Sequence, residues 1–198
     1  MTDRGQMFTV ESIAAAMLLL GTVVFVTQTA GVTALTASTA SQQVSEGRYG
    51  DAVGVLDAAT TAETVRPTLL HWDEANGSFH GTGDERYFVS GGPPTAFGTL
   101  LNETFTSRDV TFNVNVVYVE TDGEQARVPL VRQGTPSDEA VVATRTVTLY
   151  DDDVLRDADG NRTSRTLGSL DPDSFYVPDR SAGPVYNVVR VEVVVWPV

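Results

Sequence analysis

The hydrophobic and polar positions divide the chain into one continuous apolar stretch and a longer, mixed remainder. Between Ser12 and Ser45 there is no charged residue, although 20% of the whole chain is charged. The most apolar part, 13–26, is interrupted only by a glycine and a threonine. A membrane-spanning helix needs about 20 mostly apolar residues, and lipid requires its backbone groups to be bonded internally. We therefore predict a transmembrane helix that continues into a stem, over 7–43.

The remainder has the patterns of strands and of one amphipathic helix. Apolar residues recur at helical spacing over 97–105, directly after a turn that contains two prolines. Period-two or β-branched patterns predict strands at 111–120, 126–131, 141–150 and 185–196. Alternation of this kind is typical of an antiparallel sheet that is covered on one side. The predicted fold class is α+β: a long N-terminal transmembrane helix followed by a small antiparallel-sheet head domain with one or two packed helices.

Shorter signals refine this outline. The residues 33–43 either continue the helix or fray into a linker, and the glycines of 47–50 are expected to end it. Asp51 then caps a short helix. A further short strand is expected at 87–89.

The predicted domains are a cytoplasmic leader over 1–6, the transmembrane and stem helix over 7–43, and an extracellular head over 44–198. Arg4 is the only basic residue near the apolar stretch. Because basic residues tend to remain cytoplasmic, the N-terminus is placed inside. The expected location is the cell membrane, as a single-pass protein with its C-terminal domain extracellular.

Glu11 stands at the head of the apolar stretch, where a carboxylate is costly in lipid and indicates a partner or a function. An Arg-Gly pair, a few residues, a glutamate and an apolar helix together resemble the class III signal and N-terminal helix of type IV pilin-like proteins. The resemblance covers roughly the first 35 residues. It implies that a prepilin-type peptidase removes the leader and that the freed amine pairs with the glutamate of a neighbouring subunit.

The processing and assembly residues implied by this resemblance are Gly5, Gln6, Met7 and Glu11. The family usually places the glutamate at the fifth mature position. Cleavage after Gly5 would make Glu11 the sixth mature residue, whereas cleavage after Gln6 makes it the fifth, so the site is defined to within one residue.

Two other interpretations of the N-terminal region remain open. One is a plain single-pass anchor in which Glu11 has no role. The other is an ordinary secretory signal with Arg4 in its basic region, 13–26 as its apolar region and cleavage near 38–40. Only the pilin-like interpretation and the plain anchor keep the helix attached to the head.

Charge and composition restrict the partners. The chain has 26 acidic and 13 basic residues, every basic residue is an arginine, and there is no cysteine. An acidic surface without lysine resembles proteins of salt-loving archaea, since high salt screens the repulsion between carboxylates. It argues against a nucleic-acid partner. Disulfides and thiolate metal sites are excluded, and the expected partners are the membrane, other pilin-like subunits and the peptidase.

Three sequons occur, at Asn76, Asn102 and Asn161, each with a non-proline middle residue. The first and third lie in predicted loops and are the better acceptors for N-glycans, whereas Asn102 lies in the predicted helix. Chance occurrence is the alternative, because the chain is rich in serine and threonine.

Two polar groups are candidate metal sites. The aspartates of 151–153 with those of 157–161 offer oxygen ligands for Ca²⁺ but lack the full loop spacing, which favours a solvated acidic turn. His71, Asp73, Glu74 and His80 match no known zinc spacing. We predict no metal site, no catalytic residue and no cofactor, and therefore not an enzyme; a metal-dependent enzyme using the histidines is the least favoured hypothesis.

The sequence thus predicts a pilin-like, membrane-anchored surface protein of a haloarchaeal type, as a minor or accessory subunit of a type IV pilus-like assembly. The alternative is a single-pass, membrane-anchored extracellular binding module that does not polymerise.

Overall fold

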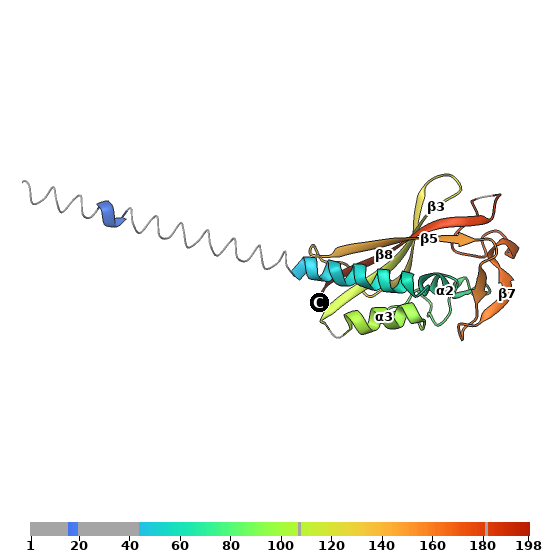
Figure 1. Cartoon of the computed structure of the whole chain (residues 1–198), viewed down its shortest axis with the longest axis horizontal. Helices are drawn as coiled ribbons and strands as arrows, with labels where there is room; N and C mark the ends of the chain where they lie inside the picture. Colours follow the sequence, from blue (N-terminus) through green and yellow to red (C-terminus); the bar gives the residue numbers. More distant parts are fainter. Residues whose placement is uncertain (1–15, 20–43, 107, 181) are drawn as a thin grey trace, which may run out of the picture. The chain divides into compact units, whose positions relative to one another are not determined.

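A computed structural model describes residues 16–19, 44–106, 108–180 and 182–198. The chain divides into two units, Met1–Val44 and Ser45–Val198. The labelled helices and strands of Figure 1 all belong to the second unit, which is described from here on.

The predicted transmembrane helix is not found among the residues that the structure describes. The described chain is mainly β-sheet with a few short helices, and none of the helices among its described residues is long and apolar enough to cross a membrane. The helix over 44–61 carries four charged side chains, which lipid would not tolerate. The expected span over 7–43 lies outside the described residues except for a helical turn at 16–19. The predicted fold class, with its long N-terminal transmembrane helix, is therefore wrong: the described residues form mainly β-sheet with a few helices. The prediction of a single-pass protein in the cell membrane with an extracellular C-terminal domain is corrected for the same reason.

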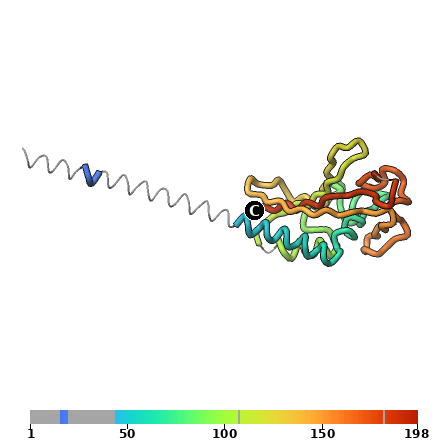
Figure 2. The backbone as a smooth tube through the Cα atoms, turned by 45° about the horizontal axis from the view of Figure 1, so that its top comes forward, coloured from blue at the N-terminus to red at the C-terminus, as the bar shows by residue number. Residues whose placement is uncertain are grey.

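Four strands form one antiparallel sheet in the order β4-β3-β8-β5. Their bounds are Val110–Val119 (β3), Gln125–Arg132 (β4), Val141–Tyr150 (β5) and Val185–Pro197 (β8). Each strand expected from the sequence in this part of the chain is present. Figure 2 shows β5 and β8 running side by side, in agreement with their register. β8 is central, and its apolar side chains on the covered face are fully buried at Val189, Val191, Val193 and Val195.

Pro129 lies in β4. A proline would be excluded from a central strand. Pro129 faces Asn115 at a point where the register between β3 and β4 shifts. Proline cannot donate to a neighbouring strand, so it is confined to edge strands and bulges. β4 is an edge strand of the four-stranded sheet, which accommodates Pro129.

Helices cover one face of the sheet. They are the helix over 44–61, α2 (Val65–Leu69) and α3 (Ala96–Phe105). The side chain of Thr95 caps α3 by accepting a hydrogen bond from the backbone N–H of Gly98 at 3.3 Å. Phe97, Leu101 and Phe105 of α3 are buried, which confirms the helix expected after the prolines.

The helix over 44–61 continues through the glycines of 47–50, where the sequence predicted that it would end. Its buried face has helical spacing and consists of Ala52, Val55, Leu56 and Ala59. A glycine inside a helix costs about 1 kcal/mol relative to alanine, whereas burying one large apolar side chain contributes about 1.5–3 kcal/mol. Packing on the sheet therefore outweighs the local preference to stop.

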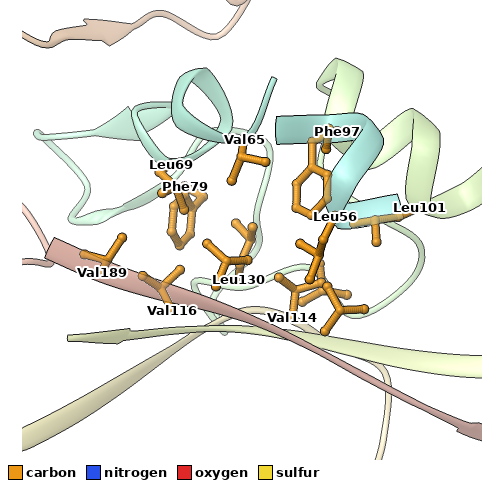
Figure 3. Close-up of a cluster of buried hydrophobic side chains, with 14 of the residues drawn as sticks. Leu56, Val65, Leu69, Phe79, Phe97, Leu101, Val114, Val116, Leu130 and Val189 are labelled. Carbon is orange, nitrogen blue, oxygen red and sulfur yellow. The ribbon is translucent and has the colours of Figure 1, made fainter. Parts of the chain in front are cut away.

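The core lies between these helices and the sheet. Figure 3 shows Leu56, Val65, Leu69, Phe97 and Leu101 of the helices, with Phe79, pointing toward strand side chains. The strand residues that meet them are Val114, Val116, Leu130 and Val189. A core from three helices and four strands explains why a chain without cysteine forms a defined head.

Two small hairpins complete the unit. They are formed by β1 (Trp72–Asp73) with β2 (Ser78–Phe79), and by β6 (Val154–Arg156) with β7 (Arg162–Thr166). A single 3₁₀ turn, Leu167–Ser169, follows β7. The strand expected at 87–89 is only a bridge between Phe88 and Val131, because its backbone has partners on one residue alone.

Candidate functional site

The residues predicted to carry processing and assembly cannot be placed. Gly5, Gln6, Met7 and Glu11 lie outside the described residues. Their roles stay predictions that rest on the sequence.

The two histidines of the chain come together although they belong to different ends of the first hairpin. His71 precedes β1 and His80 follows β2, and their ring centroids are 5.1 Å apart in an edge-on arrangement. His71 is 2% exposed, and its Nε2 lies 3.4 Å from the carbonyl oxygen of Ala158. Burial lowers the pKa of His71 below its usual 6.5, an effect that the Ala158 carbonyl partly opposes. His71 is therefore neutral at pH 7.

Of the two carboxylates that the sequence grouped with these histidines, Asp73 lies 3.8 Å from the Nδ1 of His80, and both accept shorter bonds from other residues. Asp73 accepts hydrogen bonds from the backbone N–H groups of Ala75 and Asn76 and from the Asn76 side chain at 2.6 Å. These bonds, the Asn76 side chain first, lower the pKa of Asp73. Glu74 is engaged by Arg165 through two hydrogen bonds of 2.6 and 3.2 Å. Among the residues that the structure describes, no three histidine or acidic side chains are placed to hold a metal ion.

The acidic loop between β6 and β7 is closed by its own hydrogen bonds. Asp157 accepts bonds from the backbone N–H groups of Asp159 and Asn161, at 3.0 and 2.8 Å. The bond from Asn161 is the main reason why the pKa of Asp157 lies below its usual value. The loop therefore has the geometry of a tight polar turn.

The three sequon asparagines differ in accessibility. Asn76 and Asn161 are exposed in the turns of the two hairpins. Asn102 is half-buried on α3, and its side-chain oxygen accepts a hydrogen bond of 2.7 Å from the backbone N–H of Gly92. Asn102 therefore holds the turn before α3, a structural role that the sequence did not reveal.

Sequence reasoning also missed a group of arginines. Arg66 on α2, Arg156 at the end of β6 and Arg162 at the start of β7 line one cavity of about 520 Å³. The signal in the sequence was slight: two arginines flank the loop 157–161 symmetrically, and Arg66 is 90 positions away from the first of them. Only the packing of the β6–β7 hairpin against α2 brings the three together.

Comparison with known proteins places the chain in a family. The model of the Family of unknown function (DUF7288) matches residues 4–195, so the chain belongs to this family. No curated protein and no solved structure matches the chain.

Proposed function

We propose that this DUF7288 member is a pilin-like subunit, minor or accessory, of a type IV pilus-like assembly. Two things support the proposal. The first is the resemblance of the N-terminal residues to the processing signal and helix of type IV pilin-like proteins. The second is the packing of the helix over 44–61 into the core of the head.

The observation that carries the proposal is how firmly the helix over 44–61 is built into the head. Its apolar face is part of the core, and three of its four charged side chains form ion pairs with other parts of the unit. The ion pairs join Arg48 to Glu139, Asp51 to Arg108 and Asp57 to Arg145. A subunit displayed on a filament needs such a connection, because a head that is loosely linked to its helix would not hold a fixed register.

In this proposal Glu11 neutralises the terminal amine of a neighbouring subunit after a prepilin-type peptidase has removed the leader. Inside an apolar helix bundle such a pair is strong only while both partners are present. Removing one partner leaves a buried charge, which costs about 3–5 kcal/mol. Glu11 should therefore be essential for assembly and unimportant for the fold of the head.

The test is Glu11→Ala, with Glu46→Ala as the matched control. Glu46 is an exposed glutamate on the 44–61 helix. Both variants should have the circular dichroism spectrum and urea midpoint of the wild type. Only Glu11→Ala should fail to enter filaments by electron microscopy of cells and by immunoblot of the sheared surface fraction. Normal incorporation of Glu11→Ala would refute the role assigned to Glu11.

The mature N-terminus, determined by mass spectrometry of the native protein, is an independent test. A first residue of Gln6 or Met7 supports processing by the prepilin-type peptidase. A start at Met1 or Thr2, or one near Ser41, contradicts it.

A binding module that does not polymerise is the second candidate, and the arginine-lined cavity favours it. The two candidates differ in the role of the N-terminal residues. A binding module should keep its ligand affinity and its cellular role in the Glu11→Ala variant.

A further inference from the structure

The arginine-lined cavity has the size of a ligand site. Its volume of about 520 Å³ lies within the range of about 300–1,000 Å³ that small-molecule sites usually have. The walls come from the end of the 44–61 helix, α2, β5 and the β6–β7 hairpin. All of these belong to the same unit of the chain.

Arg156 and Arg162 are direct cross-strand partners in the β6–β7 hairpin. Side chains in this relation have Cβ atoms about 4.5–5.5 Å apart, and like charges placed opposite each other destabilise the pairing. The arrangement is unexpected in a chain with 26 acidic and only 13 basic residues. An anion held between the two guanidinium groups would remove the repulsion.

Among the described residues, the two arginines of this pair, Arg156 and Arg162, have no carboxylate partner. The Nε of Arg156 is buried and has no hydrogen-bond partner there, and the Nη1 of Arg156 makes only a long bond of 3.5 Å to the carbonyl oxygen of Gly160. Unused guanidinium donors in a concave site are a ready-made receptor for carboxylate or sulfate oxygens.

Two carboxylates also line the cavity, and one of them, Asp153, already has partners within the protein. Asp153 accepts a hydrogen bond of 2.8 Å from the backbone N–H of Tyr150 and lies 3.8 Å from the Nε of Arg66. The guanidinium of Arg66 in turn lies over the ring of Tyr150, 5.3 Å from its centroid. Arg66 is thereby fixed in place, and Glu63, the other carboxylate, is exposed. The local balance is positive in a molecule whose net charge is −13.

The two arginines stand on a fixed support. The backbone N–H of Arg156 donates a hydrogen bond of 2.8 Å to the carbonyl oxygen of Leu70, which ties β6 to the end of α2. The loop that separates the arginines is closed by the bonds of Asp157 described above. Because the support does not have to form on binding, little ordering entropy opposes the ligand.

The lining of the cavity is also rich in hydroxyl groups. Thr146 and Thr148 of β5 line the cavity, together with Thr60 of the 44–61 helix. β5 is an edge strand of the described sheet, so one side of its backbone faces none of the other described strands. From the guanidinium groups, hydroxyl groups and strand-edge backbone that share this lining, we infer that the cavity binds an acidic sugar, through its carboxylate or sulfate at Arg156 and Arg162 and its hydroxyls at β5.

The test is isothermal titration of the purified full chain with glucuronate, with glucose 6-sulfate as a second acidic ligand and glucose as the neutral control. Both acidic sugars should bind and glucose should not. Arg162→Gln should weaken the binding of the acidic sugars about tenfold to a hundredfold, since one set of charge-assisted hydrogen bonds is lost. Arg132→Gln, which removes the same charge from an exposed position on β4, should leave the affinity unchanged.

Arg162 is exposed, so its substitution should not disturb the fold, and the circular dichroism spectrum of each variant checks this. Arg156→Gln provides a second variant at the same pair. The inference is overturned if the wild type binds neither acidic sugar, if glucose binds equally well, or if Arg162→Gln and Arg132→Gln behave alike. Binding of a hexaglutamate peptide without binding of glucuronate would also overturn it. Because affinity is measured on the dissolved chain, these results are independent of whether Glu11 directs assembly.

Discussion

Gly98 offers a sharp test of the packing before α3. The turn that contains Gly92 and Pro93 runs directly against the first turn of the helix. A Cβ placed on Gly98 would lie 2.7 Å from the backbone nitrogen of Pro93 and 2.8 Å from its carbonyl carbon, and would also clash with its carbonyl oxygen. The obstacle is backbone on both sides, so no side-chain rotation relieves it.

The expected effect of Gly98→Ala is the difference between two opposing contributions. Alanine improves helix propensity by at most about 1 kcal/mol. Forcing extra atoms into a packed site typically costs about 1–3 kcal/mol, and more when the backbone must move. We therefore expect the free energy of unfolding to fall by about 1–2 kcal/mol or more.

Gly54→Ala is the matched control. Gly54 lies in the middle of the 44–61 helix, is exposed, and has no atom within 4 Å of the position its Cβ would take. Here the gain in helix propensity is unopposed, so the free energy of unfolding should rise by about 0.5–1 kcal/mol.

Both free energies are measured by urea unfolding followed by circular dichroism, at one pH and one salt concentration. The same substitution in two helices should thus change stability in opposite directions. If Gly98→Ala proved as stable as the wild type, the close approach of the two backbones, and with it the described packing of α3, would be wrong.

Three further predictions follow from other contacts. Glu192 is 6% exposed and pairs with Arg127 at 2.9 Å and Arg190 at 3.1 Å. Glu192→Gln removes the charge from both pairs and should lower the free energy of unfolding; the loss is limited to about 1–2 kcal/mol because both arginines are partly in water. An unchanged urea midpoint would contradict this. Burial holds the pKa of His71 below 6.5, so as pH falls the unfolded chain binds a proton at this histidine before the folded chain does. The contribution of neutral His71 to the free energy of unfolding is therefore present above pH 6.5 and declines below it. His71→Gln should make the urea midpoint less dependent on pH between 7.5 and 5.5, and an equally steep dependence would exclude His71 as the source. If the native protein is glycosylated, peptide mass spectrometry should find sugar on the two hairpin sequons and none on Asn102, whose side chain is held by Gly92; a glycan on Asn102 alone would contradict the described turn.

Some of the local structure followed from the sequence because it depends on pattern alone. The strands of the sheet were predicted from the alternation of apolar residues, and α3 from their spacing after the prolines. The edge position of β4 agrees with Pro129, which cannot donate a hydrogen bond to a second neighbour. The small hairpins were missed because β1, β2 and β6 have only two or three residues, too few to show a period, and β7, with five residues, contains no apolar one.

The sequence by itself determined the sheet, the helix that covers it and the acidic, cysteine-free surface, because side-chain alternation, helical spacing and charge are properties of neighbouring residues. The tertiary structure alone decided that the 44–61 helix passes through its glycines, since the energy that holds it comes from the distant sheet. It also decided that Arg66, Arg156 and Arg162 share one cavity. No local rule brings residues so far apart in the chain to one place; only the docking of the β6–β7 hairpin on α2 does so.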